Sequence, residues 1–187
     1  MPFDLDLIPG LATREELVSV ADEATLIDRI GSLPLTPFRF QGFTGKRLTT
    51  SFGWAYDFDN GRFAETDPVP HWLPPLRERA ADLANLEPGD LVQALVIRYD
   101  PGAGIGWHRD RPVFDQVVGV SLGAPAVLTF RQRTATGFRR VKLALPPRSA
   151  YHLAGEVRRD WEHGIAAHDA LRFSITFRSL LHGAPTR

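Results

Sequence analysis

The chain has 187 residues, of which 43% are hydrophobic, so it can bury one sizeable core and is too short for two full domains. Its 22 basic and 22 acidic residues give a formal charge of zero, which excludes a global attraction to nucleic acid or to membranes. The absence of cysteine excludes disulfides, thiolate metal sites, iron–sulfur clusters and a cysteine nucleophile, so any metal ligands must be His, Asp or Glu.

The first stretch, MPFDLDLIPG, has no basic segment before an apolar one, and no run in the chain approaches 18 apolar residues. We therefore expect a soluble, cytoplasmic protein with no membrane contact. The sequence shows no internal repeat and no low-complexity linker, which favours a single domain over residues 1–187. No feature indicates an obligate protein partner.

Three helices are expected in the first half of the chain. Thr13-Arg14-Glu15-Glu16 fits a capping box, which predicts a helix from there to about Ala21. A second helix is expected from Thr25 to Ile30, ended by Gly31. A third is expected from Pro74 to Leu86, because proline suits the first turn of a helix and apolar residues recur at helical spacing.

From Leu91 onward the pattern changes to short runs rich in β-branched and aromatic residues, separated by glycine and proline. These runs are LVQALVIRY, QVVGVSL, AVLTFRQR, RRVKLAL, SAYHLAG and LRFSITFRSL. Their length and spacing favour a barrel or a double-sheet jelly roll over an α/β fold. In the last run, Arg172, Ser174, Thr176 and Arg178 alternate with apolar residues, which predicts a polar strand face inside the roll.

The segment GIGWHRDRP carries the first candidate metal ligands. His108 and Asp110 lie two residues apart, so an extended chain points both side chains to the same side. His163, in WEHGI, can complete the site if the roll brings the two strand ends together. Two histidines and one carboxylate are typical of non-haem iron(II) oxygenases, but zinc with a hydrolytic water fits the same set, and a surface ion pair remains possible.

Arg172 follows His163 by nine residues, which is long enough for a loop and a strand that returns to the metal. Burying an arginine in a cavity costs free energy unless it pairs with a carboxylate, which it can bind through two parallel hydrogen bonds. A reaction of O2 at iron needs two electrons from a cosubstrate, and Arg172 offers an anchor for one that carries a carboxylate.

Four segments together resemble the AlkB-like 2-oxoglutarate and iron(II)-dependent dioxygenases: RYDPGAGIGWHRD, VVGVSLGAPAVLTF, WEHGI and LRFSITFR. They occur in the family's order over residues 91 to 180, and the ending Arg-x-Ser-x-Thr-Phe-Arg closely resembles the family's Arg-x-Asn-x-Thr-Phe-Arg. The resemblance implies a mainly β fold, a double-stranded β-helix over residues 91–181. An N-terminal α/β extension, residues 1–90, would pack on it as a helical scaffold and substrate lid.

The resemblance also implies roles for individual residues. His108, Asp110 and His163 are expected to bind iron(II) and form the catalytic centre, with 2-oxoglutarate and O2 as cosubstrates. Arg172 is expected to pair with the distal carboxylate of 2-oxoglutarate, and Tyr99 to hydrogen-bond the same end. Arg178 is expected among the cofactor-binding residues on the iron side, near Asp110 and the substrate, or as a purely supporting salt bridge. Ile97 stands where the family has an Asn that contributes to the cosubstrate pocket, and Ser174, an expected cofactor-binding residue, replaces another Asn on the last strand, so cosubstrate affinity can differ.

The activity that the resemblance implies is oxidative demethylation of N-alkylated bases in DNA or RNA, with release of formaldehyde. The segment from Lys46 to Tyr56 corresponds to the family's lid, so Trp54 and Tyr56, with Arg111, are the expected substrate contacts. Equally, Phe52, Trp54 and Tyr56 can alternate into the core of a hairpin. A local basic cluster offers phosphate contacts, or is simply a solvated hairpin; its members are Arg131, Arg133, Arg139, Arg140 and Lys142.

Two other functions stay open. The segment Arg111-Pro112-Val113 lacks the acidic residues of bacterial base-repair members, which, with the zero net charge, favours the same chemistry on a protein side chain. A roll that binds a modified ligand without turnover is least favoured, because all three metal ligands and Arg172 are present.

Overall fold

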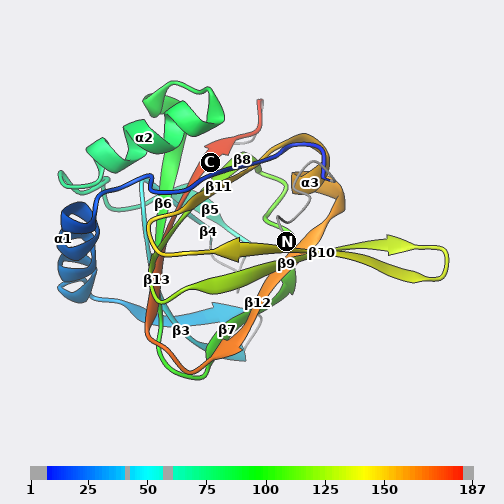
Figure 1. The fold of residues 1–187 in the computed structure, drawn as a ribbon. Coiled ribbons are helices and arrows are strands. Elements are labelled where there is room, and N and C mark those ends of the chain that lie inside the picture. Colours follow the sequence, from blue (N-terminus) through cyan, green and yellow to red (C-terminus); the bar gives the residue numbers. More distant parts are fainter. Residues whose placement is uncertain (1–7, 41–42, 57–60, 183–187) are drawn as a thin grey trace.

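The computed structural model describes residues 8–40, 43–56 and 61–182. Two antiparallel sheets pack face to face in this part of the chain, and helices cover the outer surface of the larger sheet (Figure 1). The fold is therefore mainly β with flanking helices, as the sequence predicts.

The larger sheet has seven strands in the order β1-β11-β8-β13-β6-β3-β2 among the described residues. Their bounds are β1 Leu11–Arg14, β11 Ala150–Leu153, β8 Phe114–Gly123, β13 Arg172–Leu180, β6 Leu91–Tyr99, β3 Phe43–Phe52 and β2 Thr36–Phe40. The central strand, β13, pairs along its length with β8 on one side and with β6 on the other.

The smaller sheet has the order β10-β9-β12-β7, with β10 Gly137–Leu145, β9 Ala126–Thr134, β12 Glu162–His168 and β7 Ala103–His108. A two-stranded ribbon joins β4 Trp54–Tyr56 to β5 Phe63–Glu65. The helical elements are α1 Val20–Gly31, α2 Pro74–Ala84, the 3-10 turn η2 Pro88–Asp90 and the short α3 Gly155–Asp160. In Figure 1 the tip of the β9–β10 hairpin extends well beyond the rest of the roll.

The two faces of β13 belong to different environments. Phe173, Ile175 and Phe177 are buried in one core with apolar residues of α1 and α2, such as Ile30 and Leu76. Burying each such side chain stabilises the fold by roughly 1.5–3 kcal/mol. The alternate residues are polar and almost as deeply buried, and they point between the two sheets. The predicted polar face inside the roll is confirmed.

A second core fills the other end of the space between the sheets, where Leu128, Phe130 and Leu143 meet Leu153. Trp161 is fully buried there and donates its indole N–H to Glu156 at 3.1 Å. Its side chain is therefore part of the packing beneath the strands.

The predicted start of the first helix is wrong. Residues 11–14 form strand β1, in which Thr13 pairs with Tyr151 of β11, so the sheet outcompetes the local capping signal. The capping box lies instead at Ser19, whose side chain accepts from the backbone N–H of Asp22, and one continuous helix, α1, replaces the two expected ones. The predicted third helix is confirmed as α2, which ends at Asn85 in the left-handed conformation.

The N-terminal half is less helical than the sequence suggests, because β1 extends one edge of the larger sheet while β2 and β3 extend the other. Gly53 allows the sharp turn from β3 to β4, since its φ is +77° and a Cβ there would lie 2.1 Å from the carbonyl oxygen of Val92. No helix among the described residues is long and apolar enough to cross a bilayer. The opening segment, residues 1–7, lies outside the described residues.

His152 of β11 predicts a pH dependence of folding. Burial lowers the pKa of its imidazole below the ordinary 6.5, with Asp115 opposing the shift, and its Nε2 donates to the Gln116 side chain at 2.7 Å. As the pH falls, His152 is therefore protonated in the unfolded chain at a higher pH than in the folded one. The unfolded state is stabilised by this proton, so the contribution of neutral His152 to stability is lost below about pH 6.5.

Replacing His152 with Gln keeps a hydrogen-bonding side chain that does not titrate. Urea unfolding between pH 7 and pH 5 should show a shallower loss of stability for this variant, by up to roughly 1.4 kcal/mol per pH unit. Equal slopes for the variant and the parent protein would contradict this account.

Candidate metal centre

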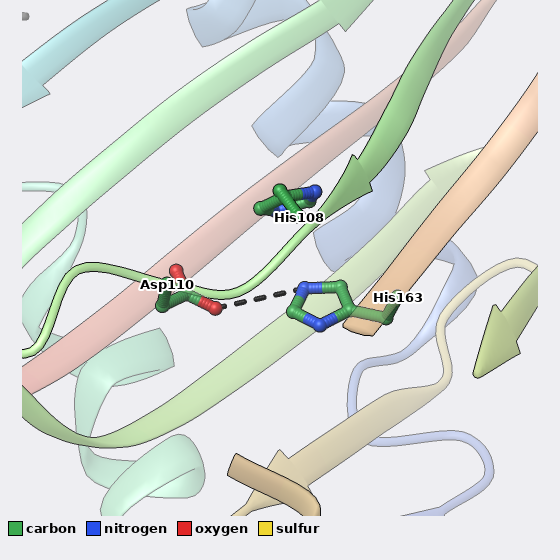
Figure 2. A group of neighbouring side chains, drawn as sticks. All are labelled: His108, Asp110 and His163. Atoms are coloured by element: carbon green, nitrogen blue, oxygen red, sulfur yellow. Dashed lines mark ion pairs between the residues drawn. The ribbon is translucent and has the colours of Figure 1, made fainter. Parts of the chain in front are cut away.

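Three side chains converge at one end of the roll, where β7 and β12 lie side by side. His108, Asp110 and His163 each offer one ligand atom, and these atoms lie within 4.8 Å of one another (Figure 2). His108 ends β7, Asp110 lies in the loop that leads to β8, and His163 lies on β12. The sequence therefore identified three residues that the fold brings together.

The pairing of β7 with β12 sets the distance between the two histidines. His108 and His163 are direct partners across the two strands, and their ring centroids are 4.3 Å apart. The strands approach closely because residue 164 is glycine, since a Cβ there would lie 2.9 Å from the carbonyl oxygen of Ile105. The Gly in WEHGI thus has a structural role beside the ligand.

The protonation states of the histidines suit a metal ligand. His108 Nδ1 lies 2.9 Å from the carbonyl oxygen of Gly106 and donates to it, which leaves the lone pair of Nε2 available. Burial lowers the pKa of His108, and burial together with His108 lowers the pKa of His163 to about 3. His163 is therefore neutral, and its 3.6 Å contact with Asp110 is not an ion pair.

Asp110 remains ionised although it is buried. Burial raises the pKa of its carboxyl group, but nearby positive charge, above all the guanidinium of Arg178 with a smaller effect from Arg158, outweighs burial and holds that pKa well below its usual range. Arg178 donates through Nε to Asp110 Oδ1 at 2.8 Å, and its Nη2 lies 2.7 Å from the same oxygen.

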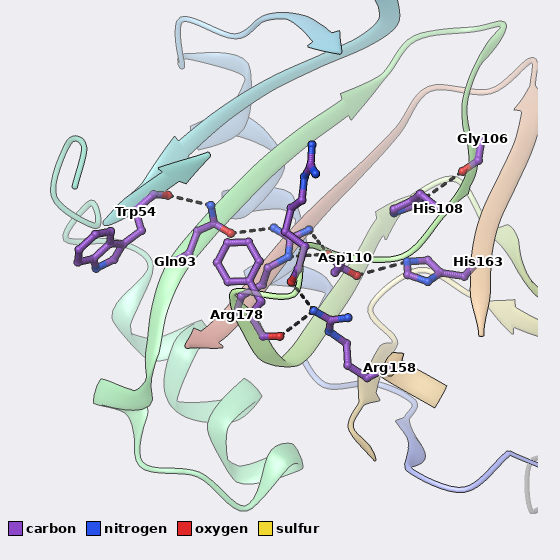
Figure 3. A network of polar contacts seen from close by, with 10 residues as sticks. Trp54, Gln93, Gly106, His108, Asp110, Arg158, His163 and Arg178 are labelled. Carbon is purple, nitrogen blue, oxygen red and sulfur yellow. Dashed lines mark hydrogen bonds and ion pairs between the residues drawn. The ribbon is translucent and has the colours of Figure 1, made fainter. Parts of the chain in front are cut away.

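A chain of hydrogen bonds links this ion pair to the β4–β5 ribbon (Figure 3). Arg178 Nη1 donates to Gln93 Oε1 at 2.9 Å, and Gln93 Nε2 donates to the backbone carbonyl of Trp54 at 2.8 Å. The position of Asp110 is therefore coupled to the backbone of the segment in which substrate contacts are expected.

Arg158 of α3 fixes the loop that carries Asp110. Its buried Nη2 donates to the carbonyl oxygens of Arg111 at 2.6 Å and Phe114 at 2.7 Å, the two ends of the turn that follows Asp110 (Figure 3). This contact of Arg158 could not be predicted from the sequence, because α3 and the loop are far apart along the chain.

Arg172 is the most deeply buried charged side chain of the site, with 1% of its surface exposed. It is the direct cross-strand partner of Tyr99, and its guanidinium lies 4.8 Å from the centre of that ring. Nη2 donates to Ser121 at 3.2 Å, but Nε and Nη1 are buried without a hydrogen-bond partner. A buried cation with unmet donors fits an anion that enters the roll.

Ser174 and Ile97 lie beside this arginine. They are direct partners across β13 and β6, and both are buried on the inner face. Ser174 therefore shares the inner face with Arg172, and the apolar Ile97 packs against Tyr99.

The expected substrate contacts gather on the other side of Asp110. Phe52 is buried in the helix-covered core, which agrees with the core alternative for that residue. Trp54 and Tyr56 are only half-buried. The ring of Trp54 stacks on Phe63 with centroids 4.9 Å apart, and the Arg111 guanidinium lies 4.4 Å from the ring centre of Tyr56.

Two further residues of the inner roll were not singled out from the sequence. The Tyr151 ring lies over Gly119, where a Cβ would be 2.3 Å from the ring, and burial, with Tyr99 and Asp110 nearby, raises the pKa of its hydroxyl. Gln93 lies on the inner face of β6 with Ile97 and Tyr99. Strand alternation from Tyr99 could have identified Gln93, whereas Tyr151 depends on a long-range strand pair.

Residues 5–178 match the model of the 2OG-Fe(II) oxygenase superfamily, so the chain belongs to that superfamily and uses iron(II), 2-oxoglutarate and O2. Within it, the protein is an AlkB-like oxygenase, as the sequence motifs predict. The donor set fits these groups, because two neutral imidazoles and an ionised carboxylate suit iron(II), and the unmet donors of Arg172 suit a carboxylate.

Individual relatives show how far the likeness extends. An uncharacterized protein of Acanthamoeba polyphaga mimivirus is 28% identical over 144 residues, which cover 67% of this chain and 68% of that protein. The alkylated DNA repair protein ALKBH8 homolog of Arabidopsis thaliana is 27% identical over 199 residues, which cover 92% of this chain but 56% of that protein. The solved structure of OsALKBH1 has a TM-score of 0.73 at 18% identity, covering 92% and 98% of the two chains, and shows the shared fold.

The role of Arg158 can be tested by replacing it with Met. Two buried carbonyl oxygens then lose their donor, at roughly 1–3 kcal/mol each, and the Asp110 loop loses its anchor. We expect a lower free energy of unfolding and an affinity for Mn(II) about tenfold weaker, measured by electron paramagnetic resonance.

Arg159→Met is the matched control, because Arg159 is the exposed neighbour on the same helix. It should change neither quantity appreciably. Parental Mn(II) affinity in Arg158→Met would show that Arg158 stabilises the loop without positioning Asp110.

Proposed function

We propose that His108, Asp110 and His163 hold iron(II) in an enzyme that oxidatively demethylates N-alkylated bases in nucleic acid, of the DNA or RNA alkylation-repair type. The neutral imidazoles and the ionised carboxylate support the ligand assignment. A single domain over residues 1–187 and a cytoplasmic location belong to the same proposal.

The cosubstrate is assigned to the inner face of the larger sheet. Arg172 pairs with the distal carboxylate of 2-oxoglutarate through the donors that lack partners, and Tyr99 and Ser174 line the same end of the pocket. Arg178 belongs to the metal end, because its donors already hold Asp110 and Gln93.

Bound iron(II) with 2-oxoglutarate and O2 supplies the oxidation of a substrate C–H bond, and hydroxylation of an N-methyl group leads to loss of formaldehyde. The residues of the chain bind and orient the reactants. Arg178 keeps Asp110 ionised, Gly106 fixes the His108 tautomer, and the buried inner face limits access of water to the reacting carbon.

The observation that best supports a nucleotide substrate is an open groove beside the metal centre. Arg109, which lies between two of the proposed ligands, lines it with Arg131, Arg133 and Phe138 of the β9–β10 hairpin. Asp160 and Glu162 also line this groove, and Glu162 pairs with Arg131 at 2.6 Å, so the three arginines exceed the acidic side chains by one positive charge. Cations beside an aromatic ring suit phosphates and bases.

The half-buried rings on the opposite side of Asp110 suit a target base. Trp54, Tyr56 and Arg111 are the proposed substrate contacts, since an aromatic ring and a guanidinium plane both stack on bases. The name of the Arabidopsis relative, an alkylated DNA repair protein, agrees with such a substrate.

A protein side chain is the second candidate substrate. The loop after Asp110 reads Arg111-Pro112-Val113 without an acidic residue, and the chain as a whole is neutral. The neutral chain does not attract a polyanion at long range, so attraction to nucleic acid depends on the local groove.

Formaldehyde release distinguishes the two substrates. The parent protein, supplied with iron(II) and 2-oxoglutarate, should release formaldehyde from methylated oligonucleotides and not from methylated peptides. His108→Ala should abolish release, because it removes a proposed ligand. Release from peptides alone would exclude the nucleic-acid proposal and leave the oxygenase chemistry standing.

Arg172→Met tests the cosubstrate assignment. We expect the KM for 2-oxoglutarate to rise roughly 10- to 100-fold, as for loss of a hydrogen-bonded charge worth about 1.5–3 kcal/mol, while Mn(II) affinity stays nearly unchanged. Without cosubstrate the variant should melt at a higher temperature than the parent, because a buried and unpaired cation has been removed. Loss of Mn(II) binding would instead show that the role assigned to Arg172 is wrong.

A further inference from the structure

Strand β3 contributes a third arginine to the inside of the roll. Thr49 pairs with Ile97 and Ser51 with Leu95 across β3 and β6, so these positions share the inner face with Tyr99. Arg47 lies two residues before Thr49 and therefore points to the same face. Phe52, on the alternate face, packs in the helix-covered core, which agrees with this assignment.

Arg47 lies close to the metal centre. Burial lowers the pKa of its guanidinium; Tyr99 and Asp110 raise that pKa, whereas Arg178 lowers it further. Arg47 in turn contributes to the lowered pKa of His108. The strand register agrees, because Leu48 pairs with Arg98 across β3 and β6, so the next position on each strand brings Arg47 beside Tyr99.

No acidic side chain of the described residues neutralises Arg47. Its guanidinium lies 3.9 Å from the centre of the Phe38 ring, and its Nε is buried without a hydrogen-bond partner. Arg172 also has unmet donors, but it is almost fully buried, whereas Arg47 is only partly buried and is the more accessible of the two cations. A guanidinium that stacks on a ring and has an N–H without a partner can bind an anionic oxygen.

The charges of the loaded site do not balance within the protein and its cosubstrate. Iron(II) and the doubly negative 2-oxoglutarate cancel, and Asp110 cancels Arg178. Arg172 and Arg47 then give the inside of the roll an excess of positive charge. Both carboxylates of the cosubstrate are already assigned, to the metal and to Arg172, so neither is left for Arg47, and an anionic group of the substrate can pair with it.

We infer that Arg47 binds the phosphate next to the target nucleotide and so positions the base at the metal. The inference rests on the proposed nucleic-acid substrate and names the contact that holds it. Stacking on Phe38 restricts the guanidinium, so the arginine can select the position of the phosphate as well as attract it.

Neutral linkages test this inference directly. A methylated oligonucleotide is compared with copies in which the phosphate on either side of the methylated nucleotide is a neutral methylphosphonate. For the parent protein, neutralising the bound phosphate should raise KM about tenfold or more, and neutralising a distant phosphate should have little effect. This part of the experiment needs no variant.

Variants then assign the effect to Arg47. Arg47→Met keeps an apolar chain on Phe38, and it should raise KM about tenfold for the natural linkage. In this variant the neutral linkage should cause no further increase in KM. Arg47→Lys should recover part of the affinity. Arg39→Met, on neighbouring β2, is the control that removes an exposed cation, and binding of 2-oxoglutarate should be unchanged in all three.

The possible failures are distinguishable. If the parent protein releases formaldehyde from no oligonucleotide, the proposed substrate and this inference fall together. If release occurs but the increases in KM caused by Arg47→Met and by the neutral linkage are independent and multiply when combined, Arg47 does not bind that phosphate. If Arg47→Met loses binding of 2-oxoglutarate, Arg47 belongs to the cosubstrate pocket, and the inference is wrong.

Discussion

The ion pair between Arg178 and Asp110 is the interaction on which the rest of the site depends. The two side chains are 12% and 4% exposed, so neither charge is well solvated, and loss of one partner from such a pair typically costs about 3–5 kcal/mol. The pair keeps Asp110 ionised, which a metal ligand requires. It uses only Oδ1 of the carboxylate, so Oδ2 faces His163. It also joins strand β13, which carries Arg178, to the β7–β8 loop, which carries Asp110.

A polar face inside a roll is stable only when the opposite face is well packed. Phe173, Ile175 and Phe177 provide that packing against α1 and α2, so β13 can carry two buried arginines on its other side. One of them, Arg178, is neutralised within the protein, whereas Arg172 keeps unmet donors. The same strand thus carries Arg178, whose charge is paired within the protein, and Arg172, whose free donors can bind a ligand.

Patterns local in sequence predicted much of this arrangement. The alternation in LRFSITFR gave the inner and outer faces of β13, and the short spacing of His108 and Asp110 gave a shared direction. The start of α1 was predicted wrongly, because a capping signal at Thr13 is overridden by pairing of β1 with the distant β11. Arg158 escaped prediction for a similar physical reason, since its acceptors belong to a loop more than forty residues away.

The direct pairing of His108 with His163 also bears on the order of events during folding. These residues are more than fifty positions apart, and they become neighbours only when β12 has added to β7. Long-range antiparallel pairs of this kind form late and slowly, because closing the intervening loop costs chain entropy. The nascent chain therefore presents no assembled metal site, and an ion that binds the finished site stabilises the native state by mass action.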